Sequence, residues 1–489
     1  MRLPRGKPLG TQQRVLLAII ISARRQESAC RLGDALPRLA RVWYNPDMQT
    51  KILFAALAIA GTPAAGDEDY RKPNYDESKI HPYTLEDPLA FADGTKLASP
   101  ADWPKRRAEI LEIFAKEMYG QPPPAPEAVV TEVWDVKENV LAGYCVRKQV
   151  KMWFKKDKTG PCVNWVIFAP RHAKGPSPII LFLNYRGNHE IVPDEDIPVQ
   201  QGWSRAGKLT DGHRASAKTR GRMCDPNRDD ICPLGMLLAR GYAVMSACYC
   251  EVSPDPDWND KDPAFNQKTF PYTGVFDLWP KRDESRADNT TALGAWAWAL
   301  SRGLDYAEKD PLLDAKRSVV TGCSRLGKAA LIAAARDERF AVCVPNQTGG
   351  GGAPLAKRDY GENTSTENTM FTHWYCKAYR KYAEKPWETL TFDQHLLLAS
   401  IAPRALLIEG FDTSKWMHTK GEYLACRAAA PVWKFLGRGT MPDVPYPDNY
   451  SIAGIGESFG YVRRSEQHGI SPYDWTWLMD FADREFKRR

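Results

Sequence analysis

Short apolar runs, rich in β-branched residues, alternate along most of the chain with longer segments of helical period. The apolar runs are residues 163–169, 179–184, 242–248, 318–321, 340–345 and 405–409. The Ala-rich helical segments are residues 287–305, 328–337 and 421–436. Apolar runs of this length, bounded by turn residues, are typical of strands buried on both faces. Strands that alternate with helices predict an α/β fold with a mostly parallel sheet covered on both sides.

The remaining segments have other patterns. Residues 101–119 predict a helix that Gly120 and the following prolines end. Residues 130–133 and 145–153 alternate between apolar and polar positions, as half-buried strands do. The polar stretch 200–230 has no period and predicts a loop insertion. Because no repeat and no interdomain linker is evident, we expect a single domain over residues 66–489.

Residues 48–65 have the pattern of an export signal. Lys51 supplies the positive start, residues 52–60 are apolar, and small residues follow up to Ala65. The apolar stretch is too short to cross a bilayer, and no other segment approaches that length. We therefore expect translation to begin at Met48, with residues 1–47 a non-native upstream extension. The mature protein is expected to be secreted or periplasmic, without a membrane partner.

Composition and charge narrow the possible functions. A chain of 489 residues that is 43% hydrophobic is not disordered throughout. The net charge of +7 is small, and no run of Lys and Arg suggests nucleic-acid binding. The 11 cysteines have no metal-binding spacing, although Cys224 and Cys232 flank a polar loop and would suit a disulfide in an exported protein. We expect neither a metal nor a nucleic-acid partner.

Residues 318–330 carry the most informative motif. A β-branched strand leads into Gly322, then Ser324, then Gly327, and an Ala-rich helix follows. This strand–turn–helix pattern predicts a nucleophile elbow, which exposes a serine hydroxyl at the top of the sheet. The backbone N–H after the serine then faces the oxygen that becomes negative. The spacing is G-x-S-x-x-G rather than the usual G-x-S-x-G, so a plain strand-to-helix turn is the alternative.

A serine nucleophile needs a histidine base that a carboxylate orients. In α/β-hydrolases the chain order is serine, acid, histidine. Among the four histidines after Ser324, His468 follows a strand-like segment, 459–463, close to the C-terminus. We therefore predict that His468 is the base. Residues 184–189 follow a buried strand and are expected to form either a loop beside the oxyanion site or a purely structural turn.

Four strings together resemble one known family, the glucuronoyl esterases of carbohydrate esterase family 15. The strings are G-C-S-R-L-G-K at 322–328, W-A-W-A-L-S-R at 296–302, F-D-Q-H at 392–395, and His468 followed by D-W at 474–475. The resemblance extends over residues 85–489. It implies an α/β-hydrolase fold, a three-layer sandwich, and no cofactor. It also implies a serine esterase that hydrolyses the ester between (4-O-methyl-)glucuronic acid of glucuronoxylan and lignin alcohols through an acyl-Ser324 intermediate.

The same resemblance implies roles for single residues. Ser324 would be the nucleophile, His468 the base and Arg325 the oxyanion-stabilising group, a task that suits a fixed guanidinium. The residues implied to hold the hydroxyls of the uronic acid are Lys328, Glu362 and Trp416. Lys328 lies one helical turn beyond Ser324 and can face the same cleft. Without the resemblance, Glu362 reads equally well as a solvated acid and Trp416 as a core indole.

The acid is where this sequence departs from the family. Many members have a glutamate after the strand that follows the nucleophile helix, and this chain has Gln347 there. An amide cannot hold a negative charge and cannot stabilise an imidazolium as a carboxylate does. Other members place the acid after the next strand, shortly before the sugar-binding tryptophan. We favour Asp412 at that position over Glu409.

Two other functions remain open at this stage. The first is an esterase of other acyl groups, such as acetyl esters on xylan. The second, suggested by Gln347, is a catalytically inactive homologue that binds carbohydrate. In each case the expected partner is a polysaccharide substrate, and the chain is expected to be a monomer.

Overall fold

The computed structural model describes residues 72–200, 216–228, 230–256, 272–411, 413–466 and 468–487. These residues belong to one compact unit, Tyr70–Arg489. The predicted upstream extension at 1–47, the predicted signal peptide at 48–65 and the candidate acid Asp412 lie outside the described residues.

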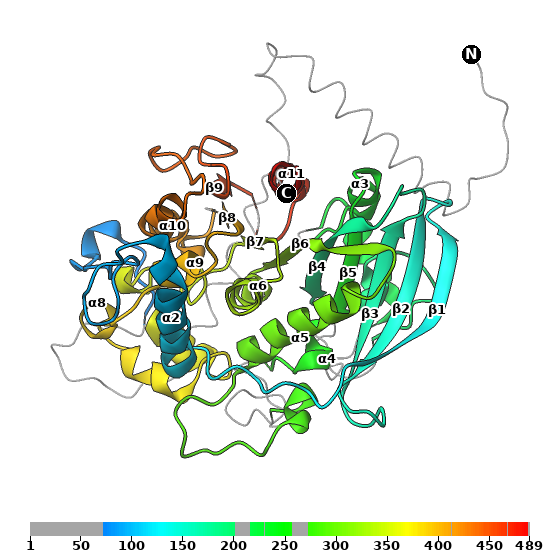
Figure 1. Cartoon of the computed structure of the whole chain (residues 1–489), viewed down its shortest axis with the longest axis horizontal. Coiled ribbons are helices and arrows are strands. Elements are labelled where there is room, and N and C mark those ends of the chain that lie inside the picture. The colour runs from blue at the N-terminus through cyan, green and yellow to red at the C-terminus, as the bar shows by residue number, and fades with distance from the viewer. Residues whose placement is uncertain are drawn as a thin grey trace, which may run out of the picture. The chain divides into compact units, whose positions relative to one another are not determined.

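Within the described residues the strands form one sheet with the order β1-β2-β3-β5-β4-β6-β7-β8-β9 (Figure 1). The strands are β1 (Val130–Val140), β2 (Cys145–Trp153), β3 (Cys162–Pro170), β4 (Ser177–Asn184), β5 (Ala243–Cys248), β6 (Leu313–Cys323), β7 (Val342–Asn346), β8 (Ala405–Phe411) and β9 (Phe459–Arg464). The pairings from β1 to β3 and on to β5 are antiparallel, and those from β5 through β4 to β9 are parallel. The predicted α/β class with a mostly parallel central sheet is confirmed.

Helices cover both faces of the sheet and complete three layers. The helices are α2 (Trp103–Glu117), α3 (Leu234–Ala239), α4 (Tyr249–Val252), α5 (Ala292–Ala307), α6 (Arg325–Arg336), α7 (Thr364–Met370), α8 (Pro386–Thr389), α9 (Gln394–Ala399), α10 (Thr419–Phe435) and α11 (Pro472–Phe486). α5, α6 and α10 pack on one face, and α3 and α11 pack on the other (Figure 1). The three-layer sandwich expected of an α/β-hydrolase is therefore present.

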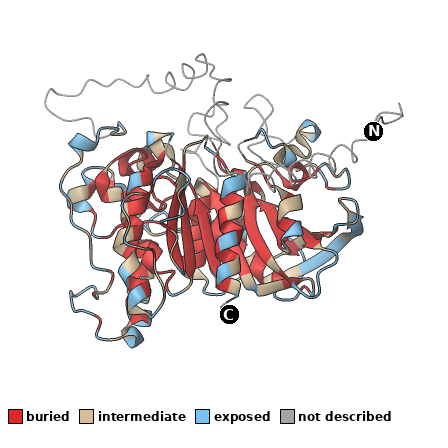
Figure 2. Ribbon diagram, turned by 90° about the horizontal axis from the view of Figure 1, so that it is seen from above, coloured by how far each residue is buried: buried red, intermediate tan, exposed pale blue. Residues whose placement is uncertain are grey.

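The burial of the strands explains the apolar runs in the sequence. Every residue of β5, β7 and β8 is buried, because helices cover both sides of the sheet there. β1, at the edge of the sheet, is mostly exposed instead (Figure 2). β2 largely alternates between buried and partly buried residues, as predicted, whereas the central strands read as continuous apolar segments.

The observed helices begin two to five residues away from their predicted starts, and the differences at α5 and α6 have a structural explanation. The helix expected over 287–305 is α5, which begins at Ala292 because the hydroxyl of Thr291 caps it and accepts from the N–H of Gly294 at 3.2 Å. The helix expected over 328–337 is α6, which begins at Arg325. It therefore starts directly after Ser324, and this fixes the position of that residue.

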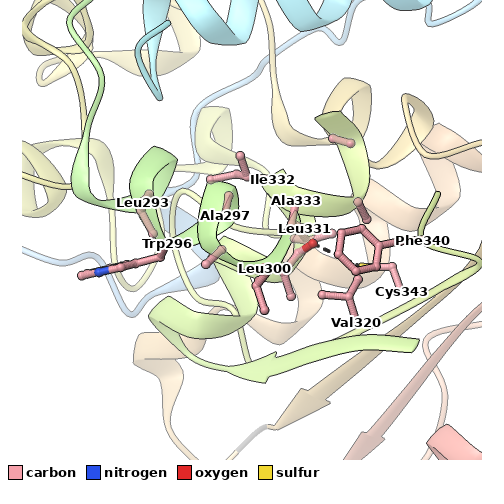
Figure 3. Packing of buried hydrophobic residues seen from close by; sticks show 14 of the residues in the cluster. Leu293, Trp296, Ala297, Leu300, Val320, Leu331, Ile332, Ala333, Phe340 and Cys343 are labelled. Atoms are coloured by element: carbon pink, nitrogen blue, oxygen red, sulfur yellow. Dashed lines mark hydrogen bonds between the residues drawn. The ribbon is translucent and has the colours of Figure 1, made fainter. Parts of the chain in front are cut away.

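α6 is held by close packing against α5 and the sheet. Leu293, Trp296 and Leu300 of α5 pack beside Ile332 and its neighbours on α6 (Figure 3). The residues of this cluster are buried, and alanines at the contact allow the two helices to approach closely. The first turn of α6 is consequently a rigid support for the side chains it carries.

The predicted loop insertion at 200–230 is described in part. Its residues 216–228 contain short 3₁₀ turns at Ala217–Thr219 and Arg222–Cys224 and no longer helix or strand. Among the described residues, no helix combines the length and the apolar character that crossing a membrane requires.

Candidate active site

Ser324 occupies a sharp turn between β6 and α6. Its backbone has φ 57° and ψ −127°, a conformation that non-glycine residues rarely adopt and that is often found at functional sites. Glycines on both sides make the turn possible. A Cβ on Gly322 would lie 2.4 Å from the carbonyl oxygen of Leu326, and one on Gly327 would lie 2.9 Å from that of Asn346. The motif therefore folds as the predicted elbow.

A cavity of about 370 Å³ opens at the carboxyl ends of β4 and β6. It brings together three of the predicted residues, Ser324, Arg325 and His468, although His468 is far away in the sequence. The other lining residues are Phe182, Leu183, Asn184, Tyr185, Arg186, Met223, Asp230, Ile231, Thr321, Gly322, Cys323, Gly469, Ile470 and Trp475. The loop after β4 thus lies beside Ser324, and the hydroxyl of Tyr185 donates to the carbonyl of Cys323 at 2.7 Å.

His468 is in contact with the amide of Gln347. The Nδ1 atom of His468 lies 2.7 Å from Oε1 of Gln347, which also accepts from the N–H of Gly469 at 3.0 Å. The Nε2 group of the same amide donates to the carbonyl of Gly469 at 2.6 Å. Since the Oε1 atom can only accept, the His468 nitrogen that faces it carries the proton. The neutral imidazole then has its lone pair on Nε2, as a general base requires.

Of the two candidate acids, Asp412 and Glu409, the structure describes only Glu409. Asp412 lies outside the described residues. Glu409 is buried, and its Oε2 accepts from the side-chain amide of Asn346 at 2.9 Å. Burial, together with the nearby carboxylate of Asp474, raises the pKa of Glu409 well above its usual value. The raised pKa favours the protonated form of Glu409, and this makes it less suited than an ordinary carboxylate to stabilise a positive charge on His468.

Arg325 is fixed by a buried carboxylate that the sequence reasoning missed. Asp255 is 1% exposed, and its Oδ2 lies 2.5 Å from Nη1 of Arg325. Asp255 also contacts His373 at 2.8 Å and accepts from Trp374 at 2.9 Å. Burial lowers the pKa of Arg325, but the charge of Asp255 outweighs this and holds it above its usual value. The guanidinium, stacked 4.6 Å over the ring of Trp374, is a fixed and permanently charged donor.

The three predicted sugar-binding residues meet beside this site. The Nζ atom of Lys328 donates to Glu362 at 3.1 Å, and the backbone N–H of Glu362 donates to the carbonyl of Trp416 at 2.8 Å. Lys328 and Glu362 are buried, and Trp416 is partly exposed. None of the three lines the 370 Å³ cavity as the described residues define it. The Nζ atom of Lys328 also lies over Trp374, 5.0 Å from the ring centroid.

The described part of the chain contains neither a metal-binding cluster nor the disulfide considered from the sequence. No group of three His, Cys, Asp or Glu residues there could hold a metal ion. Cys224 and Cys232 are not joined in a disulfide, and the thiol of Cys224 donates to the carbonyl of Ile191 at 2.9 Å.

Comparisons with known proteins agree with this geometry. A family model described as "Glucuronyl esterase, fungi" matches residues 272–437. The carbohydrate esterase MZ0003, from an unknown prokaryotic organism, is 35% identical over 444 residues, which are 89% of this chain and 98% of that protein. A 4-O-methyl-glucuronoyl methylesterase of Cerrena unicolor is 26% identical over 75% of this chain and 64% of its own length.

Solved structures of glucuronoyl esterases and CE15 esterases are also similar to this chain. The structure of a glucuronoyl esterase from Solibacter usitatus is similar with a TM-score of 0.74 and 34% identity, over 84% of this chain and all of that one. A promiscuous CE15 esterase from a marine bacterial metagenome is similar with a TM-score of 0.75 and 33% identity, over 85% of this chain and all of that one.

Proposed function

Because the chain belongs to the glucuronoyl esterases of carbohydrate esterase family 15, we propose that it hydrolyses esters of (4-O-methyl-)glucuronic acid in glucuronoxylan with lignin alcohols. The observation that carries this proposal is the common cavity of Ser324 and His468. Ser324 is on a strained elbow, and the Nε2 atom of His468 carries the lone pair. These are the two groups that acyl transfer to a serine needs.

The reaction proceeds in two steps. The Oγ atom of Ser324 attacks the ester carbon while His468 takes its proton, and a tetrahedral oxyanion forms. The Arg325 guanidinium and the N–H groups at the start of α6 stabilise that oxyanion. His468 then returns the proton to the alkoxide, which leaves as the alcohol, and the glucuronoyl group remains on Ser324. Water, activated by His468, releases the uronic acid and restores the serine.

The acyl group and the alcohol occupy different sides of Ser324 in this proposal. Lys328, Glu362 and Trp416 hold the hydroxyls of the uronic acid. The alcohol leaves from the side of His468, because that residue protonates it. Apolar side chains form part of the cavity wall, beside the charged Arg186 and Asp230, and the cavity volume suits an aryl-bearing alcohol. The apolar residues are Phe182, Met223, Ile231, Ile470 and Trp475.

Asp412 is proposed as the acid that stabilises the imidazolium, with Glu409 as the alternative. The raised pKa of Glu409 supports this choice. We further propose that residues 48–65 direct export to the periplasm or the medium and that the mature chain acts as a monomer.

The test is a comparison of ester substrates. A chain that begins at Gly66 should cleave benzyl or methyl glucuronate esters far faster than acetylated sugars, and Ser324→Ala should abolish the hydrolysis. Asp412→Asn should lower kcat by orders of magnitude, and an unchanged rate would reassign the acid. Equal rates on uronate and acetyl esters would indicate a broader carbohydrate esterase. No turnover on either would leave a carbohydrate-binding homologue.

A further inference from the structure

We propose that Gln347 is a positioning residue for His468: its neutral amide fixes both the tautomer and the orientation of the imidazole. This deepens the proposed function and rests on Ser324 and His468 acting as nucleophile and base. The Gln347 amide orients the imidazole of His468 but carries no charge that could stabilise the imidazolium. It separates two tasks, orientation and charge stabilisation, that a carboxylate performs together.

Only one orientation of the Gln347 amide fits its surroundings. The backbone of Gly469 offers a donor and an acceptor, and the amide pairs with both, at 3.0 Å and 2.6 Å. With the amide turned over, its NH₂ group would face the N–H of Gly469 and its oxygen would face the carbonyl. Both contacts would be repulsive. Oε1 therefore points toward His468, and Nδ1 of the imidazole must donate to it.

Gln347 is itself rigid, so it can impose this orientation. Its side chain is fully buried, and its backbone N–H donates to the carbonyl of Glu409 at 2.8 Å. Its φ of 48° turns the chain sharply after β7. The carbonyl of Gly469 is held from a second side by a guanidinium N–H of Arg464. The loop that carries His468 is thereby attached to β7 and to β9.

The charged groups around this loop are engaged with one another. Arg464 pairs with both carboxylate oxygens of Asp474 at 2.9 Å and with Glu466 at 3.2 Å. Burial and the carboxylate of Asp474 raise the pKa of Glu409, and its Oε2 accepts from the amide of Asn346 at 2.9 Å. The guanidinium of Arg325 pairs with Asp255. Asp412 belongs to the same region of the sequence and lies outside the described residues. The role assigned to Gln347 depends on hydrogen-bond direction and not on the titration of any of these groups.

The test replaces the amide by an apolar side chain of similar length. Gln347→Met should lower kcat on a benzyl glucuronate ester about 10²–10⁴-fold, as wrong histidine tautomers do in other triads. KM should change little, because Gln347 is not among the residues that line the cavity. Gln394→Met is the matched control, since Gln394 is equally buried, on α9, and does not line the cavity. It should keep kcat within about threefold, in line with an effect on stability alone.

NMR spectroscopy can test the tautomer of His468 directly, without relying on enzyme activity. The ¹⁵N shifts of the His468 ring, assigned by their loss in His468→Gln, should report a proton on Nδ1 in the wild type. They should report a mixture of tautomers, or an Nε2 proton, in Gln347→Met. An unchanged tautomer and an unchanged kcat in Gln347→Met would overturn the inference. If the wild type is inactive but the tautomer still changes in Gln347→Met, the esterase function is contradicted while the positioning role of Gln347 is supported.

Discussion

Asp255 is placed to affect the chemistry of the site through Arg325, whose guanidinium it holds. Four side chains converge on it, those of Arg325, His373, Trp374 and Tyr249. A buried carboxylate with this many donors keeps the guanidinium in one place. A fixed donor stabilises an oxyanion without the cost of reorganising during the reaction.

Asp255→Asn should therefore lower kcat about 10²-fold, the typical effect of losing one oxyanion donor, because the neutral amide no longer anchors the guanidinium. The measurement is steady-state kinetics on a glucuronate ester, with folding checked by circular dichroism. Asp310→Asn is the control, since Asp310 is also buried and pairs with Lys148 and Tyr306 away from the cavity. An equal loss in both variants would mean that only stability had changed.

Single residues were predictable from the sequence where a local motif defines them. Ser324, Arg325 and Lys328 all belong to residues 322–328, so their spacing on the elbow and the first turn of α6 is a local property. The partner of His468 is different, because Gln347 lies 121 residues away in the chain. Asp255 stands on a loop with no motif around it. The contacts of Gln347 with His468 and of Asp255 with Arg325 depend on how loops from separate strands come together. No local sequence pattern predicts that arrangement.

At the scale of elements, the cavity is bounded by the ends of β4 and β6, by Met223, Asp230 and Ile231, and by the first turn of α11. Met223 is a partly buried apolar residue of this wall. In the proposed reaction Met223 faces the alcohol part of the ester and not the sugar. We therefore expect Met223 to influence which alcohols the enzyme accepts.

Met223→Ala should reduce the ratio of the rates on benzyl and methyl glucuronate by about three- to tenfold, because an aryl group loses apolar contact while a methyl group does not. Competition between the two esters measures this ratio directly. Met236→Ala is the control, since Met236 packs on the same apolar cluster but does not line the cavity. A ratio that stays constant in Met223→Ala would place the alcohol elsewhere.

The elements themselves were largely predictable, and their ends were not. Apolar runs located β3 to β8 because burial on both faces leaves a continuous signal in the sequence. The start of α5 depends on the cap that Thr291 provides, and the start of α6 on the strained turn at Ser324. Both are single-residue features that the period of a helix does not reveal.

At the scale of the whole molecule, buried ionisable groups link stability to pH. Burial raises the pKa of Glu367 and of Glu422 from 4.5 to about 8. The folded protein holds these protons while the unfolded chain has released them, so stability falls as the pH rises from 4.5 to 8. Burial lowers the pKa of His395 from 6.5 to about 4, which acts in the opposite sense, but only between those values.

The melting temperature should consequently decrease between pH 6.5 and pH 8. Each of the two glutamates contributes up to about 2 kcal/mol to that loss of unfolding free energy. Differential scanning calorimetry over this range checks the prediction, and Glu367→Gln should flatten the slope. A melting temperature that rises over the same interval would contradict it.

β1 ends the sheet on one side, and its outer row of backbone groups faces solvent in the described structure. The side chains of Val133, Trp134 and Val136 are exposed and apolar, so this edge strand could pair with the edge strand of a second molecule. The charged residues interspersed with them, Glu132 and Lys137 among them, oppose that association by repulsion and hydration. Solubility during storage should thus depend on ionic strength, with concentrated salt favouring strand-to-strand aggregation.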